Sequence, residues 1–249
     1  MIAIEKLVDI AREAGKKTLE FYNSEIEVTS KDDDSPLTKA DLAAHHYIVD
    51  HLSELTDAPI ISEESGVPDY EERKDWTKFW LVDPLDGTKE FIKKNGEFTV
   101  NIALIDDGVP VQGVVHLPAK DLTYFGEKDK GSFLQEGDKK PQEIYSVMSS
   151  KEDPIRVVVS RSHGSEAQEK WIADHNVIET VPSGSSIKLC LVAEGRADVY
   201  PRLGPTMEWD VAAGDAVFRY SAKDGVHPSP ITYNKKTLKN DIFVVGMEA

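Results

Sequence analysis

The chain begins with apolar residues at positions i, i+3, i+4 and i+7 counted from Ile4. This spacing places them on one face of a helix and predicts an amphipathic helix over residues 3–22. A second helix is expected from Thr38, because Thr-Lys-Ala-Asp at residues 38–41 fits the T-x-x-D capping box. An apolar face continues from there through Leu52.

Short apolar runs separated by turn residues predict strands through the middle of the chain. The runs at 98–105 and 109–117 are joined by Asp106-Asp107-Gly108, a sequence typical of a hairpin turn. The runs at 122–125 and 132–135 extend this hairpin into an antiparallel meander. Two earlier strands are expected at 59–62 and 79–82.

The polar stretch 141–154 lacks clear periodicity, and we place a domain boundary there. Beyond it strands and helices alternate, as in α/β proteins. We therefore expect an α+β half over residues 1–150 and an α/β half over residues 151–249. The elements expected in the second half are strands at 155–159, 197–200 and 242–245, helices at 165–174 and 211–220, a helix opening within 183–188 and stopped by Gly195, and a loop at 202–208.

Composition narrows the range of functions. The chain has 249 residues, a net charge of −16 and no basic stripe, so binding to a nucleic acid polymer is not expected. A single cysteine, Cys190, rules out an intrachain disulfide. The first residues begin an amphipathic helix rather than a signal peptide, and no apolar run reaches transmembrane length. We expect a cytoplasmic protein; peripheral attachment to the inner membrane stays open.

The run at 79–82 stops at two acids on either side of Pro84 and Leu85. Pro84 fixes its own φ and favours an extended Asp83, so Asp83 and Asp86 can point at a common site while the Leu85 carbonyl stays available. Oxygen ligands without His or Cys suit Mg²⁺ or Mn²⁺ rather than zinc. The amides of residues 87–89, at a predicted helix start, suit a phosphate.

Two further acidic positions fit this picture. Glu63 and Glu64 follow the run at 59–62, and the ends of adjacent strands lie side by side in an α/β sheet. Asp210 lies in the first turn of a predicted helix. Each acid also has a purely structural interpretation: Asp86 and Asp210 as helix caps, Asp41 as a capping partner, and the Glu63-Glu64 pair as solvated surface.

Three motifs occur in a characteristic order: Ser62-Glu63-Glu64, Asp83-Pro84-Leu85-Asp86-Gly87-Thr88, and Trp209-Asp210-Val211-Ala212-Ala213-Gly214. Together they resemble the inositol monophosphatase superfamily of lithium-sensitive, magnesium-dependent phosphatases, and the resemblance covers essentially the whole chain. It implies a layered αβαβα sandwich of the sugar-phosphatase type, combining α+β and α/β halves, with the active site in the cleft between them.

Other segments resemble one branch of the superfamily, the bacterial 3′(2′),5′-bisphosphate nucleotidases. They are Lys89-Glu90-Phe91, Ser160-Arg161-Ser162-His163, Gly184-Ser185-Ser186-Ile187-Lys188 and Tyr200-Pro201-Arg202. The resemblance implies hydrolysis of the 3′-phosphate of adenosine 3′,5′-bisphosphate to AMP and phosphate, with 3′-phosphoadenylyl sulfate as a second candidate substrate and a place in sulfur metabolism.

The resemblance also implies a metal set. Glu63, Asp83 and the Leu85 carbonyl surround one Mg²⁺, and Asp83, Asp86 and Asp210 surround a second; Mn²⁺ can substitute. Glu63 is preferred to Glu64 because its interval to Asp83 resembles that of the family. A third, weaker ion is expected through waters near Asp41, which is counted with the catalytic residues.

Catalytic and substrate residues follow from the same resemblance. Thr88, bonded to Glu63, is the candidate for orienting and deprotonating the attacking water. Phosphate oxygens are expected on the amides of residues 87–89, Gly87, Thr88 and Lys89. A second phosphate needs further donors, and the candidates on the substrate side are His163, Ser185, Lys188 and Arg202, beside Asp210. The alternative for Lys188 and Arg202 is a solvated surface charge.

Two other functions stay open. One is an inositol or sugar monophosphatase on the same scaffold, which would not depend on Lys188 and Arg202 as a bisphosphatase does. The other is a catalytically silent nucleotide-binding sensor, which has no need of a water-activating pair such as Thr88 and Glu63. A small-molecule nucleotide is the expected partner, and the chain is expected to be a monomer or a homodimer.

Overall fold

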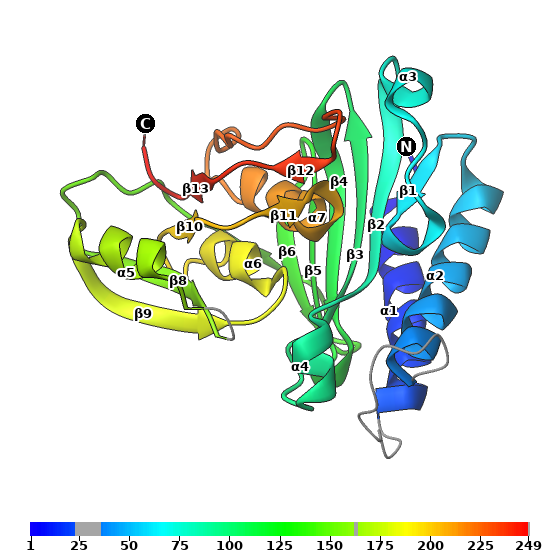
Figure 1. The fold of residues 1–249 in the computed structure, drawn as a ribbon, viewed down its shortest axis with the longest axis horizontal. Helices are drawn as coiled ribbons and strands as arrows, with labels where there is room; N and C mark the ends of the chain where they lie inside the picture. Colours follow the sequence, from blue (N-terminus) through cyan, green and yellow to red (C-terminus); the bar gives the residue numbers. More distant parts are fainter. Residues whose placement is uncertain (23–35, 162–163, 249) are drawn as a thin grey trace.

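The computed structural model describes residues 1–22, 36–161 and 164–248 (Figure 1). Its helices are α1 Ile4–Tyr22, α2 Pro36–Leu55, α3 Tyr70–Arg73, α4 Thr88–Ile92, α5 Glu166–Ala173, α6 Ile187–Ala193 and α7 Glu208–Arg219, with 3₁₀ turns η1 Glu63–Ser65 and η2 Pro118–Lys120. Its strands are β1 Ile60–Ser62, β2 Lys78–Asp86, β3 Thr99–Asp106, β4 Val109–Leu117, β5 Leu122–Glu127, β6 Gly131–Glu136, β7 Gln142–Ile144, β8 Ile155–Ser160, β9 Val177–Ser183, β10 Tyr200–Arg202, β11 Thr206–Met207, β12 Lys239–Asn240 and β13 Phe243–Val245.

A seven-stranded sheet runs through the first half in the order β1 to β7. β1 lies parallel to β2, and each later strand is antiparallel to its neighbour. The predicted hairpin between β3 and β4 is confirmed. Asp107 and Gly108 form its tip with φ values of 49° and 73°, the left-handed backbone that a two-residue hairpin turn requires.

Helices cover both faces of this sheet (Figure 1). The apolar faces of α1 and α2 pack on one face, against residues such as Trp80 and Ile102. Helices α6 and α7 pack on the other, where Leu189 and Phe218 join the largest core cluster. Beyond them lie the parallel pair β8 and β9, the pair β10 and β13, and α5. The predicted layered architecture is confirmed.

The boundary predicted near residue 150 stays a prediction. The largest core cluster crosses it, because Leu81 of β2 and Val115 of β4 share it with α6 and α7. The two halves therefore contribute to one apolar core. Among the described residues, every helix is too short or too polar to cross a membrane.

Strand β2 extends further than its apolar run predicts. The expected strand ends at Val82, but pairing with β3 continues to Asp86. Asp83 pairs with Asn101 and Asp86 with Thr99, so two residues of β2 lie opposite one residue of β3. This bulge accommodates Pro84, which has no N–H to donate to the ladder. The acids therefore lie within a bent strand end rather than in a free turn.

Two predicted boundaries are wrong. Helix α2 begins at Pro36, so Thr38 lies inside its first turn and is not the N-cap; the fixed φ of proline suits a first helical position. Arg202 ends β10 instead of opening a loop.

Strand β9 was not predicted at all; its residues are mostly exposed, with Ile178 65% exposed. A strand without a fully buried face shows little alternation of apolar and polar residues.

Candidate functional site

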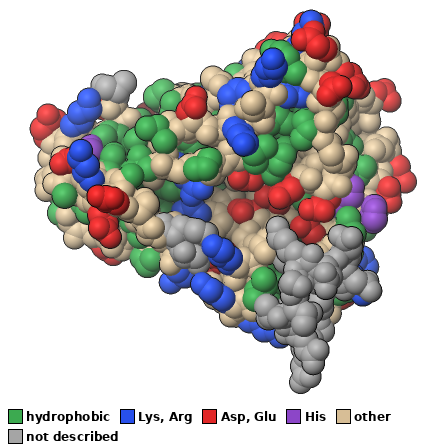
Figure 2. Space-filling model, viewed as in Figure 1, with side chains coloured by type: hydrophobic (Ala, Val, Ile, Leu, Met, Phe, Trp, Pro, Cys, Tyr) green, Lys and Arg blue, Asp and Glu red, His purple; other side chains and the backbone are tan. Residues whose placement is uncertain are grey.

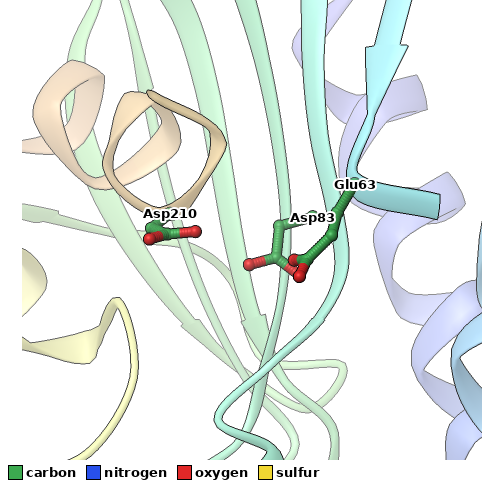
Figure 3. A group of neighbouring side chains, drawn as sticks. All are labelled: Glu63, Asp83 and Asp210. Atoms are coloured by element: carbon green, nitrogen blue, oxygen red, sulfur yellow. The ribbon is translucent and has the colours of Figure 1, made fainter. Parts of the chain in front are cut away.

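Three carboxylates from separate elements converge between the large sheet and α7. Glu63 follows β1, Asp83 lies at the bulge of β2, and Asp210 lies in the first turn of α7. One carboxylate oxygen from each lies within 4.8 Å of the other two. Figure 3 shows Glu63 and Asp83 side by side and Asp210 facing them from the helix start.

Local hydrogen bonds orient two of these acids. The Asp83 carboxylate accepts the Leu85 N–H at 3.1 Å, which follows from the tight bend around Pro84. The Asp210 carboxylate accepts the Met207 N–H at 2.8 Å. Asp210 therefore does bond the backbone at the start of α7, as its structural interpretation predicts. The same carboxylate also contributes an oxygen to the cluster.

The cluster is electrostatically strained. Burial raises the pKa of Asp83 well above its ordinary value, and the charges of Asp86 and Glu63 add to this. Burial also raises the pKa of Asp210 to about 7, with Asp86 and Glu63 contributing. Asp83 is only 1% exposed. Crowded carboxylates of this kind repel one another unless cations neutralise them, so the residues fit hard divalent cations such as Mg²⁺ or Mn²⁺.

Asp41 lies on α2, close to Glu63 and Glu64. Burial raises its pKa to about 8, and the charges of Glu64 and Glu63 contribute. Its Oδ1 atom is buried and has no hydrogen-bond partner among the described residues. Asp41 hydrogen-bonds Glu64, while Glu63 joins Asp83 and Asp210. Glu64 therefore contacts Asp41, while the charge of Glu63 acts on both Asp41 and Asp83.

A cavity of about 350 Å³ opens over the carboxylates. The predicted site residues that line it are Glu63, Asp83, Leu85, Asp86, Gly87, Thr88, Lys89, Ser185, Lys188, Arg202 and Asp210. Asp41 is not among the lining residues, and His163 lies outside the described residues. In the space-filling view, acidic side chains gather at a hollow in the middle of the molecule, with basic side chains beside it (Figure 2).

Gly87 lies where the start of α4 approaches Ser185, on the segment before α6. It precedes α4 with a φ of 92°, a backbone conformation that favours glycine. A Cβ atom at this position would lie 3.1 Å from the Cβ of Ser185. The predicted helix start at residues 87–89 is confirmed, since α4 begins at Thr88. This start packs against the segment before α6.

Lys188 is a buried cation rather than a solvated one. Its side chain is 8% exposed, and Nζ donates to the Ser185 carbonyl and lies 5.9 Å from the centre of the Tyr200 ring. Burial lowers its pKa to about 8, against the opposing effect of the Asp86 charge. The alternative of a surface charge is therefore wrong for Lys188.

Arg202 lies on the same wall as Lys188. Its guanidinium donates to the carbonyls of Gly204 and Pro205, at 3.0 and 2.8 Å. These bonds fix the loop between β10 and β11 beside the cavity. Burial raises the pKa of Asp86, while the charges of Lys188 and Arg202 and a hydrogen bond from the Ser186 amide oppose the rise.

Several lining residues were not assigned a role from the sequence. Ser186 donates to the Asn101 side chain at 2.7 Å, and its amide donates to Asp86. Thr206 and Tyr200 also line the cavity. Ser186 follows Gly184 and Ser185 at a predicted helix start, and this position is the signal that could have identified it.

Comparisons with known proteins agree with this geometry. Residues 3–220 match the model of the inositol monophosphatase family. The 3′(2′),5′-bisphosphate nucleotidase CysQ of Escherichia coli K12 is 45% identical over 227 residues, which cover 90% of this chain and 89% of that protein. The protein of the same name from Haemophilus influenzae is 35% identical over 247 residues, covering 97% and 91%.

Solved structures give the same result. The crystal structure of CysQ from Bacteroides thetaiotaomicron, described as a bacterial member of the inositol monophosphatase family, matches with a TM-score of 0.82 and 44% identity over 95% of this chain and 94% of that one. A staphylococcal IMPase-II matches with a TM-score of 0.74 over 99% and 89%, at 20% identity. The second match shows the fold alone.

Proposed function

The chain belongs to the inositol monophosphatase family, and from this premise we propose that it is a metal-dependent phosphatase that removes the 3′-phosphate of adenosine 3′,5′-bisphosphate. The products are AMP and phosphate. We extend the proposal to 3′-phosphoadenylyl sulfate as a second substrate, because it carries the same 3′-phosphate beside a second anionic group. Relatives named bisphosphate nucleotidases, at 45% identity over 90% of the chain, support this choice.

The proposal is supported above all by one observation: acidic and basic side chains line the same cavity. Glu63, Asp83 and Asp210 form its acidic wall. Lys188 and Arg202 line the same cavity and form its basic wall, and their charges act on Asp86. A substrate with two phosphates needs both: one phosphate beside the acids and their cations, and the other beside fixed positive charges. A monophosphate would have no second anionic group to place beside Lys188 and Arg202.

Metal binding is assigned to the oxygen ligands of the acidic wall. Glu63, Asp83 and the Leu85 carbonyl would hold one Mg²⁺, and Asp83, Asp86 and Asp210 a second; a third would lie near Asp41. When bound, the ions supply Lewis-acid chemistry that favours the attacking water and the leaving oxygen. Manganese suits the same ligands, and we expect it to substitute.

The chain's own groups complete the mechanism. Thr88 and Glu63 line the same cavity, and we assign them to orient the attacking water and to accept its proton. The backbone of residues 87–89 would contact the oxygens of the transferred phosphate. Ser185, Lys188 and Arg202 would bind the second phosphate; they orient the nucleotide so that its 3′-phosphate lies over the carboxylates.

Phosphate release tests this proposal directly. The purified protein is incubated with Mg²⁺ and either adenosine 3′,5′-bisphosphate or inositol 1-phosphate, each with and without lithium. We expect strong preference for the bisphosphate, inhibition by lithium, and no release after chelation of the metal. Preference for inositol 1-phosphate would contradict the substrate assignment, and tight nucleotide binding without turnover would contradict the catalytic one.

A further inference from the structure

Glu97 lies outside the acidic wall, in the segment between α4 and β3. Its carboxylate accepts three N–H groups: Nε and Nη2 of Arg161, each at 2.8 Å, and the backbone amide of Gly184 at 2.9 Å. The Glu97 side chain is 12% exposed. A bidentate guanidinium contact with a backbone donor beside it fixes the direction of a carboxylate more firmly than a single surface ion pair does.

The donors to Glu97 come from the other half of the chain. Arg161 follows β8 and Gly184 follows β9, two parallel strands whose last residues, Ser160 and Ser183, pair with each other. Glu97 itself precedes β3 of the large sheet. One carboxylate therefore ties the ends of two strands of the small sheet to the wall that carries Gly87.

The segment tied down in this way lines the cavity. Gly184, Ser185, Ser186 and Lys188 all contribute to its surface. A second set of bonds, from β3, continues the attachment. Thr99 Oγ1 lies 3.3 Å from Ser185 Oγ and 2.9 Å from Ser186 Oγ.

Packing leaves little freedom where Glu97 contacts the segment. A Cβ atom added to Gly184 would lie 2.6 Å from Glu90 Cγ and 3.3 Å from Glu97 Cβ. Burial opposes the charge of Glu97, but the Arg161 side chain and the Gly184 amide outweigh it and lower its pKa. The carboxylate is thus charged and matched by three donors, of which the Gly184 amide belongs to a residue that lines the cavity.

We propose that Glu97 is a positioning residue that fixes residues 184–188 on the cavity wall and thereby sets the places of Ser185 and Lys188 for the second phosphate of the substrate. The inference rests on the proposed function for its substrate. Glu97 does not touch the substrate itself. Its effect is on the geometry of groups that do, and small displacements of such groups have large kinetic effects.

The test compares Glu97→Ala and Glu97→Gln with the unaltered protein. We expect Glu97→Ala to raise KM for adenosine 3′,5′-bisphosphate about tenfold, with a smaller change in kcat and in turnover of inositol 1-phosphate. Glu97→Gln keeps an oxygen for the Gly184 amide and should restore part of the loss. Arg161→Met removes the guanidinium that donates to Glu97 and should change KM in the same direction. This second variant keeps the test decisive if Glu97→Ala fails to fold.

A matched control lies at the opposite end of β8. Asp198 accepts Nε and Nη2 of Arg156 at 3.0 and 2.7 Å and the Arg156 amide at 2.7 Å, the same kind of three-donor contact away from the cavity. Asp198→Ala should lower the melting temperature without changing the ratio of KM values for the two substrates. An equal change of that ratio in Asp198→Ala and Glu97→Ala would overturn the positioning role.

Amide hydrogen exchange separates this inference from the proposed function. Residues 183–188 should exchange faster in Glu97→Ala than in the unaltered protein or in Asp198→Ala, because the Gly184 amide loses its acceptor. Unchanged exchange would overturn the inference even if the protein hydrolyses no bisphosphate. Absence of turnover by the unaltered protein, together with faster exchange in the variant, would contradict the proposed function alone.

Discussion

Gly113 of β4 and Gly126 of β5 lie directly opposite each other, and helix α7 packs over both. A Cβ atom on Gly113 would lie 2.5 Å from the Ala213 carbonyl oxygen, and one on Gly126 would lie 2.8 Å from the Ala216 carbonyl oxygen. These two glycines therefore let the helix approach the sheet at backbone distance. The same helix carries Asp210. The close packing at these two glycines therefore also determines how near the Asp210 carboxylate lies to the sheet.

The first prediction follows from that contact. Gly113→Ala should lower the free energy of unfolding by about 1–3 kcal/mol, because the added methyl group overlaps backbone atoms of α7 that cannot move independently. Phosphate release should fall as well, since the shift moves Asp210. Chemical denaturation and the phosphate assay check the two effects. Gly164→Ala, at a glycine where an added Cβ atom would have no neighbour within 4 Å among the described residues, should leave both unchanged.

Metal binding should stabilise the protein through the acidic wall. Mg²⁺ is expected to raise the melting temperature, because cations relieve the repulsion around the buried Asp83 carboxylate. Asp83→Asn should abolish most of that rise, lower phosphate release at least about 100-fold, and leave the metal-free protein as stable as before or more so. Differential scanning calorimetry with Mg²⁺ and with chelator checks this. A full Mg²⁺ effect in Asp83→Asn would contradict the ligand assignment.

Substrate preference should depend on the basic wall. Lys188→Met keeps the length of a buried side chain but removes its charge, and should lower kcat/KM for the bisphosphate about 10- to 100-fold, as expected for one lost charge-assisted hydrogen bond. Turnover of inositol 1-phosphate should change much less. Steady-state kinetics on both substrates check this. Arg202→Met should act in the same direction; equal losses on both substrates would contradict a phosphate-binding role.

His116 should make the stability sensitive to acid. Burial lowers its pKa to about 4, although Asp121 opposes this, and the ring nitrogen Nδ1 bonds Thr123 at 2.9 Å. Between pH 6.5 and about 4 the unfolded chain gains a proton on His116 that the folded protein does not. The free energy of unfolding should therefore fall as the pH is lowered from 6.5 to about 4. His116 should contribute about 3 kcal/mol to this fall at most.

Urea denaturation at several pH values measures this contribution. His116→Gln should flatten the fall in the free energy of unfolding below pH 6.5, at some cost in stability at neutral pH. An unchanged slope in His116→Gln would exclude His116 as its cause.

The acidic wall was the most predictable part of the site. Glu63, Asp83 and Asp210 each stand at the end or start of an element that has a clear apolar pattern, so their positions follow from that pattern and from the order of the motifs. The meander from β3 to β6 was predictable for the same reason. What the pattern could not show was the bulge in β2, because pairing beyond Val82 depends on β3 and not on local composition.

The remaining features depend on contacts between distant parts of the chain. Glu97 is 64 residues from Arg161 and 87 from Gly184, and nothing in its own neighbourhood indicates those partners. The surroundings of Lys188 likewise include Tyr200 and Asp86, which lie on other elements. Strand β9 has no fully buried face, so it lacks the alternation that would have predicted it.

The order of the chain has a consequence for biosynthesis. Glu63 and Asp83 leave the ribosome well before α7, and the core cluster that seats α6 and α7 on the large sheet joins early segments to late ones. A nascent chain can pair the strands of the meander, but it lacks Asp210 of α7 and the basic wall. Under the proposed function, the site is therefore incomplete until α7 has been made and has docked on the large sheet.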